Sequence, residues 1–341
     1  MAKSLEQILD ELVAKLSPKI RDAFQAAIQG VDDQVILKDL ITAIQAGDYE
    51  RAFAALGMSN ASLRPITAAL QLIYEQGGVA VGQTFPKVLN TSAGRAVFRF
   101  DVTNPRAETW LKEQSSRLIV QIQEDARANV RNVITRGLEI GNNPRVTALD
   151  IVGRVDPRTG QRVGGIIGLT QQQERWVANA RRDLVELSEH YFTRTRRDKR
   201  FDSIVRKAIK DGVPLDRATI DKLIIRYKAS LLQLRGETIA RTETIQSLNR
   251  SQHEALLQAS DMGAVKMSDV KREWDSAGDI RVRDSHREMD GQTVGLDEPF
   301  KTPDGHMLMF PGDASLGADA AEIINCRCRA KIKIDWLSDL D

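Results

Sequence analysis

The residues with the clearest chemical potential lie near the C-terminal end, where Cys326 and Cys328 are separated by a single residue. Thiolates and imidazoles are the ligands that zinc prefers, and His286 and His306 would complete a Cys2His2 set with the two thiols. A Cys-x-Cys spacing is less diagnostic of zinc than Cys-x-x-Cys, and free cysteines are commonly buried as small hydrophobes. We therefore expect two reduced, packed thiols without a metal and no cofactor; metal binding is the alternative.

The same segment carries a row of cations. If residues 326–334 form a strand, alternate side chains point to opposite faces. One face then holds the cysteines and apolar residues, and the other holds four cations: Arg327, Arg329, Lys331 and Lys333. A cationic face is typical of an edge strand kept soluble. The alternative is contact with the phosphates of DNA or with an acidic partner.

A second basic run occupies residues 194–200, at the expected C-terminal end of a helix. Beyond its first residue it contains the cations Arg196, Arg197, Lys199 and Arg200. Cations at a helix C-terminus complement the helix dipole, so the interpretation we favour is a solvated helix end. Contact with DNA or an acidic protein is the alternative.

A third group combines Arg283 and His286 with Asp290 in an Asp-Gly turn. Histidine titrates near neutral pH, so this group suits acid–base catalysis. The sequence shows no phosphate-binding glycine loop, nucleophile elbow or His-Glu-x-x-His motif. We therefore expect a structural polar network and no enzyme. The alternative is a metal-dependent or nucleic-acid-processing enzyme centred on a set that shares this region: Arg283, His286, Cys326 and Cys328.

The composition is that of an ordinary globular protein. Hydrophobic residues make up 42% and charged residues 28% of the 341, and 49 Lys and Arg balance 47 Asp and Glu. A net charge of +2 excludes a protein that neutralises a long stretch of nucleic acid by bulk charge. No run approaches the roughly 18 apolar residues of a membrane span. Two cysteines exclude a disulfide-stapled scaffold, and we expect a reducing compartment.

Helical periodicity dominates the first part of the chain. We expect a helix that starts at a Ser4/Gln7 capping box and stops at Pro18, and a second that ends at Gly30. Further helices over 34–46, 48–56 and 64–75, the last stopped by Gly77-Gly78, would complete a helical N-terminal module over residues 1–78.

The middle of the chain, residues 79–260, reads as a helical body. It opens with a strand over 98–102, and Asn104-Pro105 then starts a helix over 105–140, a strut about 50 Å long. We expect further helices over 171–192, 202–211, 216–234 and 237–259. Strands and turns dominate residues 264–336, a small α+β module. The fold class is therefore α+β: a mostly helical N-terminal and central body and a strand-rich C-terminal module.

The last hundred residues resemble a known family. The motifs on which the resemblance rests are, in chain order, Ile239-Ala240-Arg241-Thr242-Glu243, Asn249, Trp274, Arg283-x-x-His286, Met289-Asp290-Gly291-Gln292, Phe300, Phe310-Pro311-Gly312-Asp313 and Asn325-Cys326-Arg327-Cys328. This series resembles the phage head morphogenesis domain of the Mu F-like minor head proteins of tailed phages. The helical body before this region is similar to such proteins in its helical pattern, with weaker motifs. Residues 1–78 carry no such resemblance.

The resemblance implies a minor capsid protein that acts in procapsid assembly near the portal vertex. Its implied locations are the phage head and, during assembly, the host cytoplasm, and some members of the family are carried inside the head and leave it with the DNA. Its implied partners are the portal protein, major capsid or scaffolding proteins and packaged double-stranded DNA, and it implies no enzymatic activity. We expect one polar network to join the last long helix to the C-terminal module, made of Arg241, Thr242, Glu243, Arg283, His286, Asp290 and Asn325.

Overall fold

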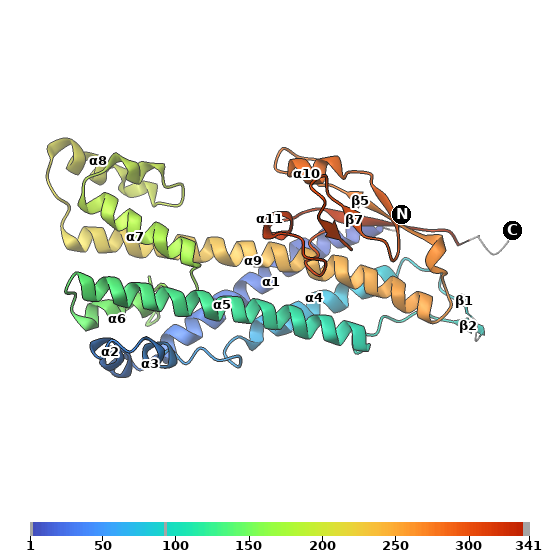
Figure 1. Ribbon diagram of the computed structural model, residues 1–341, viewed down its shortest axis with the longest axis horizontal. Helices are drawn as coiled ribbons and strands as arrows, with labels where there is room; N and C mark the ends of the chain where they lie inside the picture. Colours follow the sequence, from blue (N-terminus) through green and yellow to red (C-terminus); the bar gives the residue numbers. More distant parts are fainter. Residues whose placement is uncertain (1–2, 92–93, 337–341) are drawn as a thin grey trace. The chain divides into compact units, whose positions relative to one another are not determined.

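The computed structural model describes residues 3–91 and 94–336. Long helices alternate with short strands, and the paired strands are antiparallel (Figure 1). The α+β class predicted from the sequence is confirmed. Packing divides the chain into two units, and each is built from separate stretches. The domain boundaries predicted after residues 78 and 260 are based on changes of residue pattern along the sequence, whereas the two units are based on packing. These boundaries remain a prediction.

The first unit comprises the chain up to Asp22, Ile66–Ser115 and everything from Glu237. Four long helices contribute to it in whole or in part: α1 (Leu5–Gln34), α4 (Arg64–Gly82), α5 (Pro105–Glu139) and α9 (Arg217–Asp261). A small hairpin pairs β1 (Leu89–Thr91) with β2 (Gly94–Ala96). Inside this unit α5 and α9 run antiparallel, because Arg106 contacts Asp261 whereas Gln114 contacts Glu243.

The strand-rich part of the first unit follows α9. A three-stranded sheet has the order β6 (Thr293–Gly295), β5 (Val270–Asp275) and β9 (Arg329–Ile334). The short turn η3 (Met267–Asp269) precedes the sheet. The module also contains a hairpin of β7 (Phe300–Lys301) and β8 (Met307–Leu308). Two short helices, α10 (Asp284–Glu288) and α11 (Ala320–Ile323), complete it. Trp274 and Ala330 face each other across the register of β5 and β9.

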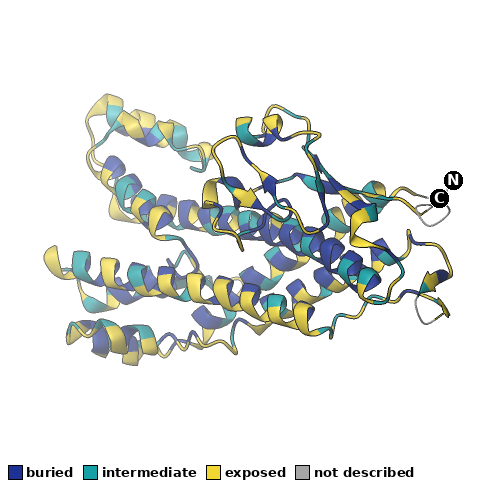
Figure 2. Ribbon diagram, turned by 45° about the vertical axis from the view of Figure 1, so that its right-hand side comes forward, coloured by how far each residue is buried: buried dark blue, intermediate teal, exposed yellow. Residues whose placement is uncertain are grey.

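Two hydrophobic clusters hold this module in place. One joins Phe85 and Phe98 to Leu256 of α9 and to Val270 and Leu296 of the module. The other lies inside the module, and its buried members are Trp274, Met289, Phe300, Leu308, Ala318, Ile323, Cys326, Cys328 and Ala330. Burial is nearly continuous along α9 from Thr242 to Ala259 (Figure 2). The module therefore shares its core with the helices.

The second unit comprises Ala23–Pro65 and Ser116–Gly236. Besides parts of the long helices it contains α2 (Leu37–Gln45), α3 (Tyr49–Ala54), α6 (Pro144–Val152), α7 (Gln171–Val185) and α8 (Asp202–Asp211). It also holds the hairpin β3 (Arg154–Val155) with β4 (Arg162–Val163), and the turns η1 (Glu189–Thr193) and η2 (Lys199–Phe201). Asn129 of α5 donates to the carbonyl of Leu169, and Arg235 of α9 donates to that of Gly168, so one loop ties two long helices together.

Several predicted boundaries are confirmed. The helix expected over 105–140 spans Pro105–Glu139, and the backbone N–H of Arg106 in its first turn donates to the side-chain oxygen of the predicted cap, Asn104. The predicted capping box at Ser4 and Gln7 is present, and a second one at Thr170 and Gln173 starts α7.

Several predicted helix ends are wrong. Pro18 lies inside α1, where Leu16 and Ile20 are buried on either side of it; continuous apolar burial outweighs the roughly 3 kcal/mol that an internal proline costs. The helix also continues through Gly77-Gly78 to Gly82 in α4, and the expected break near residue 235 is absent from α9. In contrast, the helix expected to reach residue 192 ends at Val185, where Leu187 adopts a φ of 54°.

The strand predicted over 98–102 is also wrong. Among the described residues, 97–101 belong to no helix or strand. Their alternating rings pack instead on α4, where a Cβ on Gly78 would lie 2.4 Å from the ring of Phe100 and one on Gly82 would lie 2.8 Å from the ring of Phe98. The alternation that indicated a strand therefore comes from the packing of Phe98 and Phe100 on the surface of α4.

Candidate structural and metal-binding site

A buried polar stretch of α9 receives the C-terminal module. The Asn249 amide donates to the carbonyl of Pro311 (2.9 Å) and that of Cys328 (3.3 Å), and the Gln246 amide donates to the carbonyl of Gly312 (2.6 Å). Gly312 has a φ of 89°, and a Cβ there would lie 2.9 Å from Cγ of Gln246. The Phe310-Pro311-Gly312-Asp313 motif thus docks its backbone against α9.

The predicted polar network is divided into separate local groups. Arg241 donates to the side chain of Asn325 (3.0 Å), whose backbone N–H donates to the Thr242 hydroxyl (3.0 Å). These three residues do join α9 to the module. Glu243 instead accepts from Gln114 of α5 (2.8 Å), and Asp290 accepts from the backbone N–H of Ser276 (2.8 Å). Arg283 donates to the carbonyl of Ile324, beyond α11.

His286 of α10 lies beside both cysteines. Its Nδ1 is 3.6 Å from Sγ of Cys326 and 3.4 Å from Sγ of Cys328, and all three side chains are at most 2% exposed. A hydrogen bond between the two thiols lowers the pKa of Cys328 and raises that of Cys326, and contact with His286 lowers the pKa of Cys328 further. The structure confirms that both thiols are buried and free.

The other imidazole nitrogen meets a carboxylate that the sequence reasoning missed. Nε2 of His286 lies 2.8 Å from Oε2 of Glu322, which also accepts from the Ser285 hydroxyl (3.0 Å). Glu322 belongs to α11, four residues before Cys326, and that spacing is the one signal in the sequence. His306 is not part of this group: its Nε2 lies 3.6 Å from Asp319, and it does not join the three potential ligands.

The cationic row on β9 is matched by acids. Arg327 pairs with Asp279 and Lys333 with Glu273, whereas Arg329 (3.3 Å) and Lys331 (2.8 Å) share Asp275. Arg329 also lies 2.9 Å from Asp10 of α1. In the register of β5 and β9, Asp275 stands directly opposite Arg329 and Glu273 directly opposite Lys331, where opposite charges attract. Phosphate contact by this row remains a prediction.

The basic run 194–200 is not a solvated end of a helix. It connects η1 to η2 and α8, and its arginines bind acids of the same unit. Arg194 pairs with Asp183 (2.5 Å), Arg197 with Asp202 (2.8 Å) and Arg200 with Asp198 (2.7 Å). The side chains of Arg194 and Arg197 are only about one tenth exposed. The role of Arg196 and Lys199 in partner contact remains a prediction.

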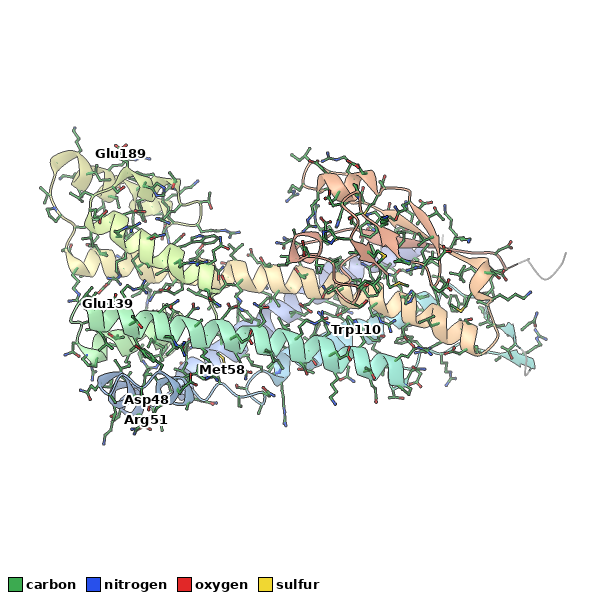
Figure 3. All side chains as sticks on the ribbon, viewed as in Figure 1. Asp48, Arg51, Met58, Trp110, Glu139 and Glu189 are labelled. Atoms are coloured by element: carbon green, nitrogen blue, oxygen red, sulfur yellow. The ribbon has the colours of Figure 1, made fainter. Side chains whose placement is uncertain are left out.

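A cleft of about 500 Å³ lies between α5, α9 and the loop after β8. Trp110 of α5, labelled in Figure 3, forms part of its wall and stacks on Tyr74 of α4 with ring centroids 5.2 Å apart. Phe310 lines it as well, beside His253, whose pKa burial lowers to about 3. This histidine is therefore neutral and is no acid–base group near pH 7.

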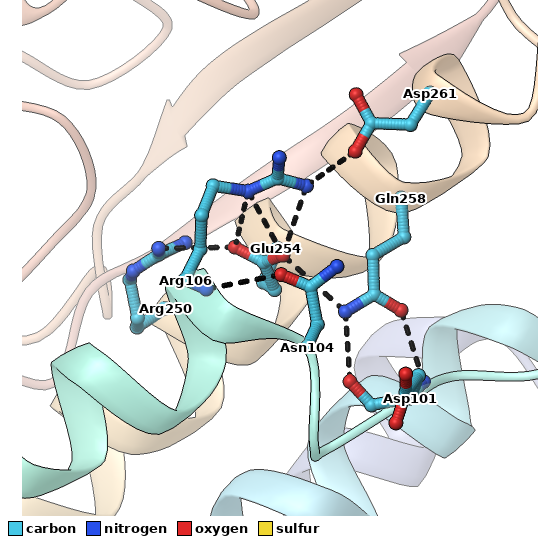
Figure 4. A network of polar contacts seen from close by, with 7 residues as sticks. All are labelled: Asp101, Asn104, Arg106, Arg250, Glu254, Gln258 and Asp261. Atoms are coloured by element: carbon cyan, nitrogen blue, oxygen red, sulfur yellow. Dashed lines mark hydrogen bonds and ion pairs between the residues drawn. The ribbon is translucent and has the colours of Figure 1, made fainter.

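Beside the cleft, an ion-pair network joins the two antiparallel helices (Figure 4). Arg106 bridges Glu254 (3.1 Å) and Asp261 (2.6 Å), and Arg250 also pairs with Glu254 (3.0 Å). Gln258 receives the backbone N–H of Asp101 and donates to its carbonyl, each at 2.9 Å. The carboxylate of Glu254 is fully buried, so two arginines are needed to compensate one charge.

With these contacts in view, part of the chain can be matched to a known family. Residues 199–331 match the family described as Phage Mu protein F like protein. The matched stretch contains the docking residues of α9, the thiol–imidazole group and most of the sheet, since it ends within β9. This match confirms the resemblance predicted from the sequence, and it is to a family of phage head proteins.

Individual relatives agree with that assignment. The chain is 25% identical to the minor head protein GP7 of Bacillus phage SPP1, over 39% of this chain and 50% of that protein. It is also 25% identical to the protein YqbB of Bacillus subtilis (strain 168), over 52% of each chain. The chain thus spans about half the length of these curated relatives.

A third relative is an enzyme. The NAD(+)–arginine ADP-ribosyltransferase EFV of Enterococcus faecalis is 31% identical over 29% of this chain but only 19% of its own length. Because the match covers so little of that enzyme, it assigns no enzymatic activity to this chain. No solved structure matches the chain. Across residues 3–91 and 94–336, none of the helices has the length and apolar character that crossing a membrane requires.

Proposed function

We propose that the chain is a minor capsid protein of a tailed bacteriophage that acts in head morphogenesis near the portal vertex. The observation that carries this proposal is the coincidence of the matched segment with the docked C-terminal module. The motif residues of the resemblance are those that the fold uses: Asn249 and Gly312 seat the module on α9, and Asn325 joins it to Thr242. Such a role requires rigid docking rather than a reaction.

The burial of the reactive side chains supports a role without enzymatic activity. A nucleophilic thiol must reach its substrate, but Cys326 and Cys328 are 2% exposed and His286 is 1% exposed. His253 is buried and neutral. The enzyme alternative centred on Arg283 therefore has less support than the structural role.

We place the attachment to the portal protein on α5. Val120 and Leu138 are 48% and 49% exposed, and they are 18 residues, or five helical turns, apart. They therefore lie on one face, about 27 Å from each other. Between them Arg127 and Arg131 contact Glu50 of α3. Apolar side chains and arginines are both common in protein interfaces, so this face suits a protein partner. Contacts with capsid or scaffolding proteins and packaged DNA, and a cytoplasmic assembly stage, belong to the same proposal.

Co-expression with the portal protein of the same phage tests this assignment. The double variant Val120→Asp/Leu138→Asp should fold but lose co-purification with the portal, because it places two charges in the interface. The matched control Val213→Asp, at a position 59% exposed in the same unit, should still co-purify.

A third variant, Ile280→Asp, tests the opposite assignment, since Ile280 is 96% exposed in the C-terminal module. If this variant loses the portal while the α5 double variant retains it, the attachment lies on the module. If unaltered chain and portal do not co-purify at all, the proposed partner is wrong.

A further inference from the structure

We propose that His286, Cys326 and Cys328 form a zinc site that stabilises the C-terminal module. The potential ligand atoms of the three residues lie within 4.8 Å of one another, and all three side chains are buried. Two sulfurs and one imidazole nitrogen are a donor set that zinc prefers. The proposal goes beyond the head-morphogenesis role and does not depend on it.

The imidazole is oriented as a metal ligand would be. Its Nε2 lies 2.8 Å from the Glu322 carboxylate without hydrogen-bond geometry, and its Nδ1 faces both sulfurs. Histidines that bind metals almost always present their other ring nitrogen to a carboxylate, carbonyl or water. The Ser285 hydroxyl fixes Glu322 in turn (3.0 Å).

Both sulfurs lie within 3.6 Å of Nδ1, whose one lone pair can accept from only one S–H group. Without a metal, the second thiol is left to hydrogen-bond to the first. A cation between the three atoms engages all of them, and the two thiol protons are released to solvent on binding. This inference replaces the metal-free interpretation that the Cys-x-Cys spacing favoured.

The site would also perform a mechanical task. His286 lies on α10, and the cysteines lie between α11 and β9, so an ion would join segments 40 residues apart. Within the residues that the structure describes, the ligand group has three members. A tetrahedral ion therefore takes a water or a small anion as its fourth ligand. Small modules with limited cores commonly gain stability from a metal.

The zinc content of the full chain is the primary test. Untagged protein purified without added metal should contain on the order of one zinc per chain by mass spectrometry of the metal. Cys328→Ser and His286→Gln should remove most of it, whereas His306→Gln, at the histidine outside the group, should retain it. Cobalt added to the metal-free chain should give thiolate-to-metal absorption that Cys328→Ser abolishes.

The variant Glu322→Gln covers the case in which ligand variants fail to fold. It keeps all three ligands and should weaken zinc binding 10- to 100-fold in competition with a chelator, at unchanged helical circular dichroism. The inference is overturned if the reduced, folded wild-type chain contains no zinc and also takes up neither zinc nor cobalt. Equal metal content in the wild type and in Cys328→Ser overturns it as well.

Discussion

Arg272 is the most heavily engaged buried cation of the module. It is 1% exposed, and its guanidinium donates to the carbonyls of Gly295, Glu298 and Met309 while lying over the ring of Phe300. Burial lowers the pKa of Arg272 to about 10, so the side chain remains charged at neutral pH. One side chain thus holds three backbone segments, and the alternation Val270, Arg272, Trp274 in β5 places it on the inner face.

Lys228 is a buried cation in the second unit, and its titration gives a prediction at the residue scale. Its ammonium donates to the carbonyl of Asp150 (3.1 Å), and burial lowers its pKa from 10.5 to about 8. Between these two values the unfolded chain binds more protons than the folded one, so this residue makes stability rise with pH.

Lys228→Met should remove that dependence. Relative to the variant, the wild type should gain about 3 kcal/mol in unfolding free energy between pH 8 and 10.5, measured by urea denaturation at a series of pH values. Lys207→Met, at an exposed lysine of α8, provides the control and should follow the wild type. A wild type and Lys228→Met with parallel pH profiles would show that the lysine titrates normally in the folded protein.

At the scale of the element, α4 is defined by glycines that face its neighbours. A Cβ on Gly77 would lie 2.2 Å from the Ser251 hydroxyl of α9, and one on Gly78 would lie 2.4 Å from the ring of Phe100. Each glycine lowers the helix propensity by roughly 1 kcal/mol relative to alanine. The absence of a side chain allows Ser251 to pack closely on Gly77 and Phe100 to pack closely on Gly78.

Gly78→Ala should therefore destabilise the protein although alanine is the better helix former. The overlap with Phe100 forces a displacement of the ring, and overpacking of this kind costs about 1–3 kcal/mol. Gly30→Ala in α1 is the matched control, because open space surrounds that position, and it should stabilise by about 0.5–1 kcal/mol. Thermal denaturation measures both; equal shifts would contradict the packing argument.

The same glycines show what could be predicted from sequence. Caps and apolar periodicity are local, so the start of α5 at Asn104 and the capping box of α7 were predictable. The continuation of α4 through Gly77-Gly78 depends on partners distant in the chain, Ser251 and Phe100, which no local pattern reveals.

The candidate site divides in the same way. The cysteines and His286 were singled out by residue type, and the proximity of Arg241 and Asn325 was expected from their shared motif series. Glu322 and the acids opposite β9 were missed because strand register and the placement of α11 bring them close. His306 was wrongly grouped with the cysteines, since residue type carries no information on position.

At the scale of the whole molecule, the chain passes between the two packing units four times, after Asp22, Pro65, Ser115 and Gly236. Each crossing falls within a helix: α1, the first turn of α4, α5 and α9. To unfold one unit alone would break these helices, and helix formation is cooperative.

We therefore expect one calorimetric unfolding transition for the full chain. Gly78→Ala, which lies in the first unit, should lower the hydrogen-exchange protection of core amides in α6 of the second unit by the same free energy as those in β5 of the first. Protection lost in the first unit alone would show that the units unfold separately.

The cluster that joins Phe85 and Phe98 to Val270 and Leu296 has a consequence for recombinant fragments and for chimeras. A gene fragment that encodes only residues 199–331 would omit both aromatic rings, and the buried side of β5 would meet water. An expression fragment must retain Ile66–Ser115 together with the chain from Glu237 onward. If a recombinant phage receives only the matched segment from a relative, it keeps its own Phe85 and Phe98. The hybrid protein would be soluble only if the sheet of the donor packs against these two rings.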